Sequence, residues 1–142
     1  MRGLILRNLS KLREYGGYLK ELQAIPLDRL KGDFMARGAA ERYLQVSIEC
    51  VIDVGNEIIS SLGLRRPERY RDIPAILAEA KVIPEVFAES VASMIGFRNL
   101  LVHDYALIDL DLVYEFIQRR VRDFEEFSRY IAECLEGSRR IE

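Results

Sequence analysis

Apolar residues recur along this chain at the three- and four-residue spacing of amphipathic helices. The first stripe predicts a helix near the N-terminus and consists of Ile5, Leu9, Leu12, Gly16 and Leu19. Gly16 stands where a larger apolar residue is expected, so it indicates either a close approach of a second helix or a kink. Pro26 and Gly32 then interrupt the pattern before the next helix.

The longest stripe predicts a helix from Asp33 to Leu62, about 30 residues or roughly 45 Å long, with Asp33 able to cap its first turn. Its apolar seam is formed by Ala40, Leu44, Ser47, Val51, Val54, Ile58 and Leu62, and is widened by Tyr43, Val46 and Cys50. So broad an apolar arc predicts a central position in the fold. The other side carries Gln45, Glu49, Asp53, Asn56 and Glu57. That side is either a solvated acidic face or a source of ion-pair partners, with Glu49 or Asp53 pairing with Arg98 or with another basic group in a groove.

A loop is expected from Leu62 to Arg71, because Gly63 and Pro67 break the helical pattern. Four arginines fall in seven positions of this loop, at Arg65, Arg66, Arg69 and Arg71. They are compatible with an ordinary surface loop. They also suit a lip that contacts phosphate, since a guanidinium matches phosphate geometry well.

Three further helical stretches complete the pattern: a short one from Asp72 to about Lys81, one from Pro84 to about Val102, and a last long one from Asp109 to Gly137. The last seam contains Leu110, Val113, Ile117, Val121, Phe124, Ile131 and Leu135, widened by Phe116 and Phe127. No stretch alternates with the two-residue period of a strand. The chain is therefore predicted to be a single all-α domain over residues 1–142, an up-down helical bundle of four main helices plus one short helix.

Arg98 and Asn99 interrupt two apolar rows of the fourth helix. One row contains Phe87, Val91, Met94, position 98 and Leu101; the other contains Ala88, Ala92, Ile95, position 99 and Val102. The opposite face carries Glu85, Glu89 and Ser93. Both polar residues are therefore expected on the buried side of the helix. A buried, unpaired guanidinium is very costly, so Arg98 needs an anionic partner or a groove that admits one.

Composition narrows the class of protein. Hydrophobic residues make up 49% and charged residues 31%, with 21 basic against 23 acidic side chains and a net charge of −2. Any RNA contact must then come from a local basic patch, and no DNA partner is expected. The N-terminus lacks a secretory signal pattern, and no apolar run has the roughly 20 residues of a membrane span, so the expected location is cytoplasmic.

Cys50 and Cys134 are expected to be buried reduced thiols, and with one histidine we predict no metal site and no cofactor.

His103 and Arg98 together suit metal-free cleavage of RNA. The 2′-hydroxyl must lose a proton and the leaving 5′-oxygen must gain one, and imidazole suits both transfers because its pKa lies near neutrality. A fixed guanidinium suits the extra charge on phosphorus. Residues five apart on a helix differ by about 140° in direction, so either the helix ends near Val102 and His103 turns back, or another chain completes the site. One histidine per chain favours a C2 homodimer that brings two copies of each residue into one groove.

The stretch Arg98-Asn99-Leu100-Leu101-Val102-His103-Asp104-Tyr105 resembles the R-x4-H signature of HEPN ribonucleases and, with Tyr105, the R-x4-H-x-Y motif of the HepT-like toxin family. The resemblance implies an endoribonuclease toxin that is active as a homodimer with a composite site, Arg98 and His103 being catalytic. It also implies silencing by an MNT-type nucleotidyltransferase antitoxin that adenylylates Tyr105. A bulky anionic nucleotide there would fill the groove and repel RNA phosphate.

The remaining residues of the motif have two interpretations each. Asn99 could orient His103 or bind a phosphate, and Asp104 could hold the imidazole tautomer or simply be exposed beyond the helix end. Tyr105 could also pack at the helix end. The alternative function is a non-catalytic helical subunit that binds the substrate or the partner of a nucleotidyltransferase. A third interpretation is a dimeric bundle in which Arg98 is only paired, in a closed dry site, with an acidic residue of the second helix.

Overall fold

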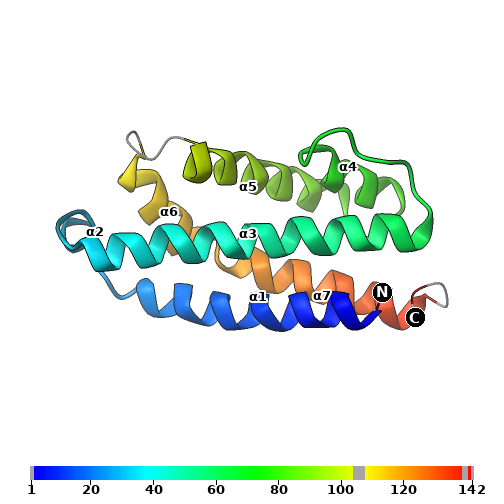
Figure 1. The fold of residues 1–142 in the computed structure, drawn as a ribbon, viewed down its shortest axis with the longest axis horizontal. Coiled ribbons are helices and arrows are strands. Elements are labelled where there is room, and N and C mark those ends of the chain that lie inside the picture. Colours follow the sequence, from blue (N-terminus) through cyan, green and yellow to red (C-terminus); the bar gives the residue numbers. More distant parts are fainter. Residues whose placement is uncertain (1, 104–107, 139–140, 142) are drawn as a thin grey trace.

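The computed structural model describes residues 2–103, 108–138 and 141, and these residues form a bundle of seven helices without a strand (Figure 1). The helices are α1 (Arg2–Leu22), α2 (Leu27–Gly32), α3 (Phe34–Leu62), α4 (Asp72–Glu79), α5 (Glu85–His103), α6 (Leu110–Arg120) and α7 (Arg122–Gly137). The prediction of an all-α bundle is confirmed. Within the described residues, no helix combines the length and the apolar character needed to cross a membrane.

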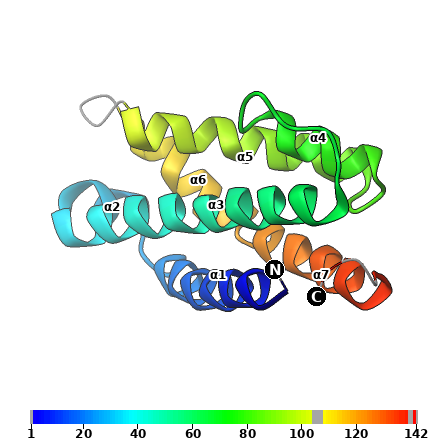
Figure 2. The ribbon, with the colours of Figure 1, turned by 45° about the vertical axis from the view of Figure 1, so that its right-hand side comes forward.

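Helix α3 is the central element and contacts each of the other helices. Figures 1 and 2 show it between a layer formed by α4 and α5 and a layer formed by α1 and α7, with α6 connecting the two layers. The predicted seam is buried: Ala40, Leu44, Ser47, Val51, Val54 and Ile58 have no exposed surface. A helix with apolar groups over so wide an arc can only be satisfied by neighbours on several sides.

Both ends of α3 follow from local chemistry. The Asp33 carboxylate accepts hydrogen bonds from the backbone N–H groups of Met35 (2.9 Å) and Ala36 (3.3 Å), as the sequence predicted. Gly63 ends the helix with a left-handed backbone, φ +66°, and its N–H bonds to the carbonyl oxygen of Ser60. The loop that follows therefore leaves α3 at a fixed point.

The number of helices differs from the prediction in two places. The chain between Pro26 and Asp33 forms the short helix α2, and the predicted last helix is two helices that run in different directions on either side of Val121 (Figure 2). Val121 keeps helical angles, φ −61° and ψ −32°, and the N–H of Phe124 bonds to its carbonyl in a tight turn. Because Val121 is buried on the same side as its neighbours, the apolar stripe continues through the bend and does not reveal it.

The close packing of backbone occurs at Gly55 and not at Gly16. A Cβ placed on Gly16 would meet no atom of a neighbouring element within 4 Å, so the close-approach interpretation is wrong. Helix α1 is also continuous through Gly16. A Cβ on Gly55 would lie 2.5 Å from Cγ2 of Ile73. The missing side chain lets α4 approach α3, and α4 in turn holds the arginine-rich loop beside α5.

Candidate functional site

Helix α5 is buried over its first half in the pattern that the sequence predicts. Phe87, Val91, Met94 and Ile95 are buried, whereas Glu85, Glu89 and Ser93 are exposed. The helix starts after Pro84, whose carbonyl accepts the N–H of Ala88. It continues to His103, so residues 98 and 99 belong to the same continuous helix as the apolar rows.

Arg98 is held between α3 and the arginine-rich loop. Its side chain is 18% exposed, and its Nη2 lies 3.5 Å from Oε1 of Glu49 on α3. The same Glu49 oxygen accepts a hydrogen bond from Nε2 of Gln45 at 3.0 Å. Of the two acidic partners proposed from the sequence, Glu49 is the one that forms the ion pair.

A second contact fixes the guanidinium from the loop side. Cζ of Arg98 lies 5.6 Å from the centroid of the Tyr70 ring, within the range of a cation–π interaction. Nε of Arg98 is buried and has no hydrogen-bond partner among the described residues. The guanidinium is thus oriented on two sides, and the exposed part of its side chain leaves room for an anion.

The α3 face behind Arg98 is crowded with carboxylates. Burial raises the pKa of Asp53 above its usual value, and repulsion from Glu49 and Glu57 raises it further, while Arg98 acts in the opposite direction. Oε2 of Glu57 is buried without a hydrogen-bond partner in the described chain. The acidic side of α3 is therefore not simply a solvated face, because its Glu49 pairs with the mostly buried Arg98.

Asn99 is exposed, which corrects the expectation that it lies on the buried side with Arg98. It is one helical step from Arg98, about 100°, and that step is enough to turn it out of the core. Its side chain lines a groove of about 610 Å³ together with Asn56 of α3 and residues 66–71 of the loop. Tyr70 belongs to both features, because it stacks with Arg98 and lines the groove.

His103 is the last residue of α5, one position beyond the predicted end of the helix. Its backbone is helical, so positions 98 and 103 lie five residues apart on one helix and differ by about 140° in direction. The expectations for Asp104 and Tyr105 fall on residues outside the described part of the chain.

The two cysteines and the acidic residues form no metal centre in the part of the chain that the structure describes. Both thiols are free, and Cys134 is only half-buried, which corrects the expectation that both are buried. Burial raises the pKa of Cys50 to about 11, so this thiol is almost wholly protonated at neutral pH.

Comparison with known proteins decides the family. The model of the family described as "Ribonuclease HepT-like" matches residues 5–131. The chain is 30% identical over 129 residues to the mRNA nuclease HepT of Shewanella oneidensis, covering 89% of this chain and 95% of that protein. It is 28% identical over 134 residues to the tRNA nuclease HepT of Aphanizomenon flos-aquae, covering 93% and 90%. The chain belongs to the HepT-like ribonuclease family.

The fold agrees with that membership. The structure of a tri-AMPylated HEPN toxin of Shewanella oneidensis, solved in complex with an MNT antitoxin, superimposes with a TM-score of 0.86 at 27% identity. The match covers 94% of this chain and 99% of that one. The recognition of a HepT-like chain from the eight residues at the end of α5 is therefore confirmed.

The contact of Tyr70 with Arg98 is not predicted by the sequence. Tyr70 lies 28 positions before Arg98, yet its ring stacks on that guanidinium. The signal available was an aromatic residue between Arg69 and Arg71 in the loop that had been singled out for its arginines alone. No periodicity connects a loop to a distant helix, so the contact could not be derived.

Proposed function

We propose that this chain is a metal-independent endoribonuclease toxin of the cytoplasm, active as a homodimer and neutralised by an MNT-type nucleotidyltransferase antitoxin. The observation that carries the proposal is the placement of Arg98. It projects from an otherwise apolar row of α5, is oriented by Glu49 and Tyr70, and keeps part of its side chain exposed. Membership in the HepT-like family supports the same activity.

The reaction uses the 2′-hydroxyl of RNA as its internal nucleophile. His103 removes the proton from that hydroxyl, the 2′-oxygen bonds to phosphorus, and the bond from phosphorus to the 5′-oxygen breaks. A second imidazole gives a proton to the leaving 5′-oxygen. Arg98 stabilises the charge that develops on the phosphoryl oxygens. The products carry a 2′,3′-cyclic phosphate and a 5′-hydroxyl.

The homodimer supplies the second imidazole. Val86 and Leu100 on α5 are 81% and 46% exposed, and a spacing of 14 residues places them on one side of the helix. Position 103, three residues after Leu100, falls on that side as well. Pairing α5 with its counterpart about a two-fold axis would cover these apolar side chains and bring the two His103 positions together.

The partner and its chemistry are proposed from the relatives. The Shewanella oneidensis toxin was solved AMPylated and bound to an MNT antitoxin, and a related toxin–antitoxin complex was solved with AMP-PNP. In this chain we assign the modification to Tyr105, two residues after His103. Transfer of AMP from ATP to its hydroxyl, with release of pyrophosphate, would place negative charge two residues from His103 and oppose RNA phosphate. Asn99 and Asp104 are assigned supporting roles next to Arg98 and His103.

The alternative, a non-catalytic subunit for a nucleotidyltransferase, is less well supported. Two relatives of this chain are named as nucleases, one of mRNA and one of tRNA. A purely structural role for Arg98 is also disfavoured. Its side chain is 18% exposed, and its Nε has no partner in the described chain. A closed structural ion pair would bury the guanidinium and use all of its donors.

The decisive experiment is RNA cleavage with a chelator present. The purified parent chain is incubated with a mixed RNA pool in EDTA, beside His103→Ala, Arg98→Ala and the control Arg13→Ala. The parent and the control are expected to produce fragments ending in cyclic phosphate. The two motif variants should be slower by about two to four orders of magnitude, because each removes a proton-transfer or charge-stabilising group.

A Tyr105→Phe variant separates activity from neutralisation. It is expected to cut RNA like the parent but to remain active after incubation with the partner nucleotidyltransferase and ATP, since it lacks the hydroxyl that accepts AMP. If Arg98→Ala and His103→Ala both cut RNA at the parent rate, the catalytic assignment is wrong. If the parent cuts only without chelator, the metal-independent mechanism is wrong.

A further inference from the structure

The groove beside Asn99 is a built feature of the bundle. It has a volume of about 610 Å³ and lies between Asn56 of α3, Asn99 of α5 and residues 66–71 of the loop. Figure 1 shows this loop as a green arch that leaves the end of α3 and reaches α4 over the layer that contains α5. The groove therefore lies beside Asn99, near the start of the motif.

The loop that forms one wall is held in place by its own side chains. Arg65 makes a two-pronged ion pair with Glu79 of α4, with Nε to Oε1 at 3.0 Å and Nη2 to Oε2 at 2.7 Å. Oδ2 of Asp72 accepts the backbone N–H groups of Glu68 (3.1 Å) and Arg69 (2.9 Å). These bonds fix the backbone between α3 and α4, so that a ligand does not have to order the wall when it binds.

Three arginines of this wall have no acidic partner among the residues that the structure describes. The side chains of Arg66, Arg69 and Arg71 are exposed and form no ion pair or hydrogen bond with the described residues, in contrast to Arg65. Glu68 is the one acidic residue among those lining the groove, so three positive charges against one negative leave a local charge of +2. The whole chain has a net charge of −2. The groove is thus a basic patch on an acidic protein.

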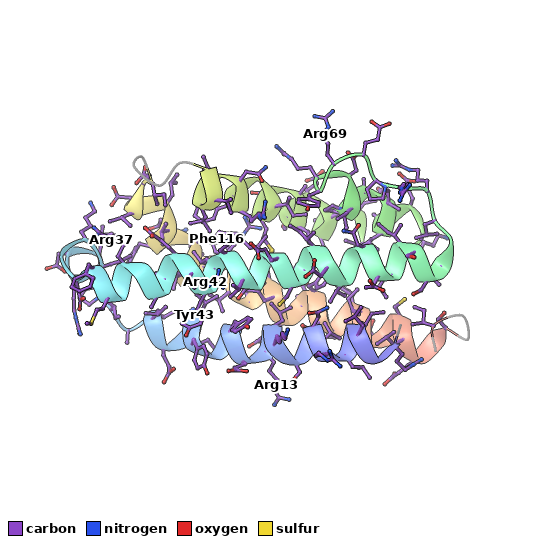
Figure 3. All side chains as sticks on the ribbon, viewed as in Figure 1. Arg13, Arg37, Arg42, Tyr43, Arg69 and Phe116 are labelled. Carbon is purple, nitrogen blue, oxygen red and sulfur yellow. The ribbon has the colours of Figure 1, made fainter. Side chains whose placement is uncertain are left out.

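The arginines extend from the motif helix outward. Nη1 of Arg71 lies 3.7 Å from the point where a Cβ on Gly96 would stand, so this guanidinium rests against α5 two residues before Arg98 and three before Asn99. Arg69 points away from the bundle at the outer edge of the loop (Figure 3). Between them Tyr70 is 49% exposed and stacks with Arg98. The positive charges therefore continue from Arg98 along one side of the groove.

We propose that this groove binds the phosphodiester backbone of single-stranded RNA next to the bond that is cut. Guanidinium groups bind phosphate oxygens in a planar, two-pronged manner, and a row of them matches a chain of phosphates better than a single anion. The half-exposed Tyr70 ring offers a surface for an unstacked base, which a single strand can supply and a duplex cannot. The inference rests on the proposed ribonuclease function and assigns to it a substrate-binding subsite outside the motif.

Direct binding tests the subsite without cleavage. A fluorescent 2′-O-methyl RNA oligonucleotide, which lacks the nucleophilic hydroxyl, is titrated with the parent chain and with Arg66→Ala/Arg69→Ala at several salt concentrations. Each lost phosphate contact on a single strand lowers the slope of log affinity against log salt by about 0.7. The double variant is expected to lose about 1.4 from that slope and to bind about 25-fold more weakly at 0.1 M salt.

The matched control is Arg7→Ala/Arg13→Ala on α1. Both residues are exposed and have no ion pair in the described chain. Arg13 and Arg69 project from opposite sides of the bundle (Figure 3). This variant changes the net charge by the same amount but should leave the salt slope of the parent. Equal slopes for the two double variants, or no binding of the oligonucleotide by the parent, overturn the subsite.

Cleavage of unmodified RNA by the same variants separates the two proposals. Loss of substrate binding should raise KM about tenfold or more with kcat nearly unchanged, because the groove contacts are made equally in the ground and transition states.

If the parent cuts RNA and the groove variant has the KM of the control, the subsite is wrong and the ribonuclease stands. If the parent binds through the groove but cuts nothing, the ribonuclease is wrong and the subsite stands. If the groove variant instead loses only its binding to the nucleotidyltransferase, the groove is a protein interface and the inference fails.

Discussion

The two halves of α5 form one continuous helix but have different roles. In the first half, Val91, Met94 and Ile95 have no exposed surface and pack into the core. In the second half, Arg98 occupies the next position of the same row and is 18% exposed, with an ion pair to Glu49 and a buried Nε that lacks a partner in the described chain. Within about one turn, the same row thus changes from a buried core residue, Met94, to a partly exposed charged residue, Arg98.

The difference teaches how a small bundle separates stability from function. The first half contributes apolar burial, which is insensitive to the direction of each contact. The second half places a polar group where the core gives way to a groove, and the group is left with donor capacity that a purely structural residue would use. Mutations at Met94 and at Arg98 should therefore have opposite effects on stability and activity.

The largest expected contrast is between Met94→Ala and Arg98→Ala. Truncating the buried methionine should cost about 2–5 kcal/mol of unfolding free energy, because it removes apolar contacts and leaves a cavity. Truncating the arginine should cost less than about 1 kcal/mol, since the Glu49 carboxylate is partly solvated and an unsatisfied donor disappears with the side chain. Urea unfolding measures both values.

RNA cleavage per folded molecule should show the reverse order. Met94→Ala is expected to keep activity near that of the parent at a temperature where it is folded, whereas Arg98→Ala should lose it. A strongly destabilised Arg98→Ala, or an inactive but well-folded Met94→Ala, would contradict the division of α5 into two halves.

A smaller effect is expected at Tyr70, which orients Arg98 from the loop. Tyr70→Ala removes the ring and should lower kcat about twofold to fivefold, the range of an exposed cation–π contact, while loss of the base-stacking surface acts separately on KM. Tyr70→Phe keeps the ring and should cut RNA at a rate close to that of the parent. If both substitutions have the same effect, the hydroxyl and not the stacking with Arg98 is responsible.

The smallest effect concerns Asp53 on the acidic side of α3. Burial, followed by repulsion from Glu49 and Glu57, raises the pKa of this carboxyl in the folded chain. Folding therefore favours its protonated form, and the stabilisation is lost as the pH rises through the raised pKa. Asp53→Asn should give a small rise in melting temperature at pH 7. The gain should vanish below the ordinary aspartate pKa of about 3.9, where the parent side chain is also neutral. Calorimetry across this pH range tests it, and an equal gain at both ends would refute the electrostatic cause.

Much of the site could be predicted, because the residues that carry it stand out against a periodic background. Arg98 was found from its position in an apolar row, and Glu49 was one of two partners suggested by the polar side of the second helix. The exposure of Asn99 was not predicted, since a position at the edge of a helical face can turn to either side. Tyr70 could not be found, because its contact with Arg98 joins a loop and a helix that no sequence period relates.

The sequence by itself determined the helical class, the central place of α3 and its capped ends, because these depend on local spacing, on the Asp33 side chain and on the left-handed backbone at Gly63. It also determined the family, through the eight residues at the end of α5 and beyond. Only the tertiary structure decided where α6 bends into α7, and which carboxylate and which ring hold Arg98. The approach of α4 at Gly55, and with it the position of the arginine groove, was also decided there. The physical reason is that spacing along a chain records which side of a helix is apolar, whereas contacts between elements depend on packing distances that spacing does not contain.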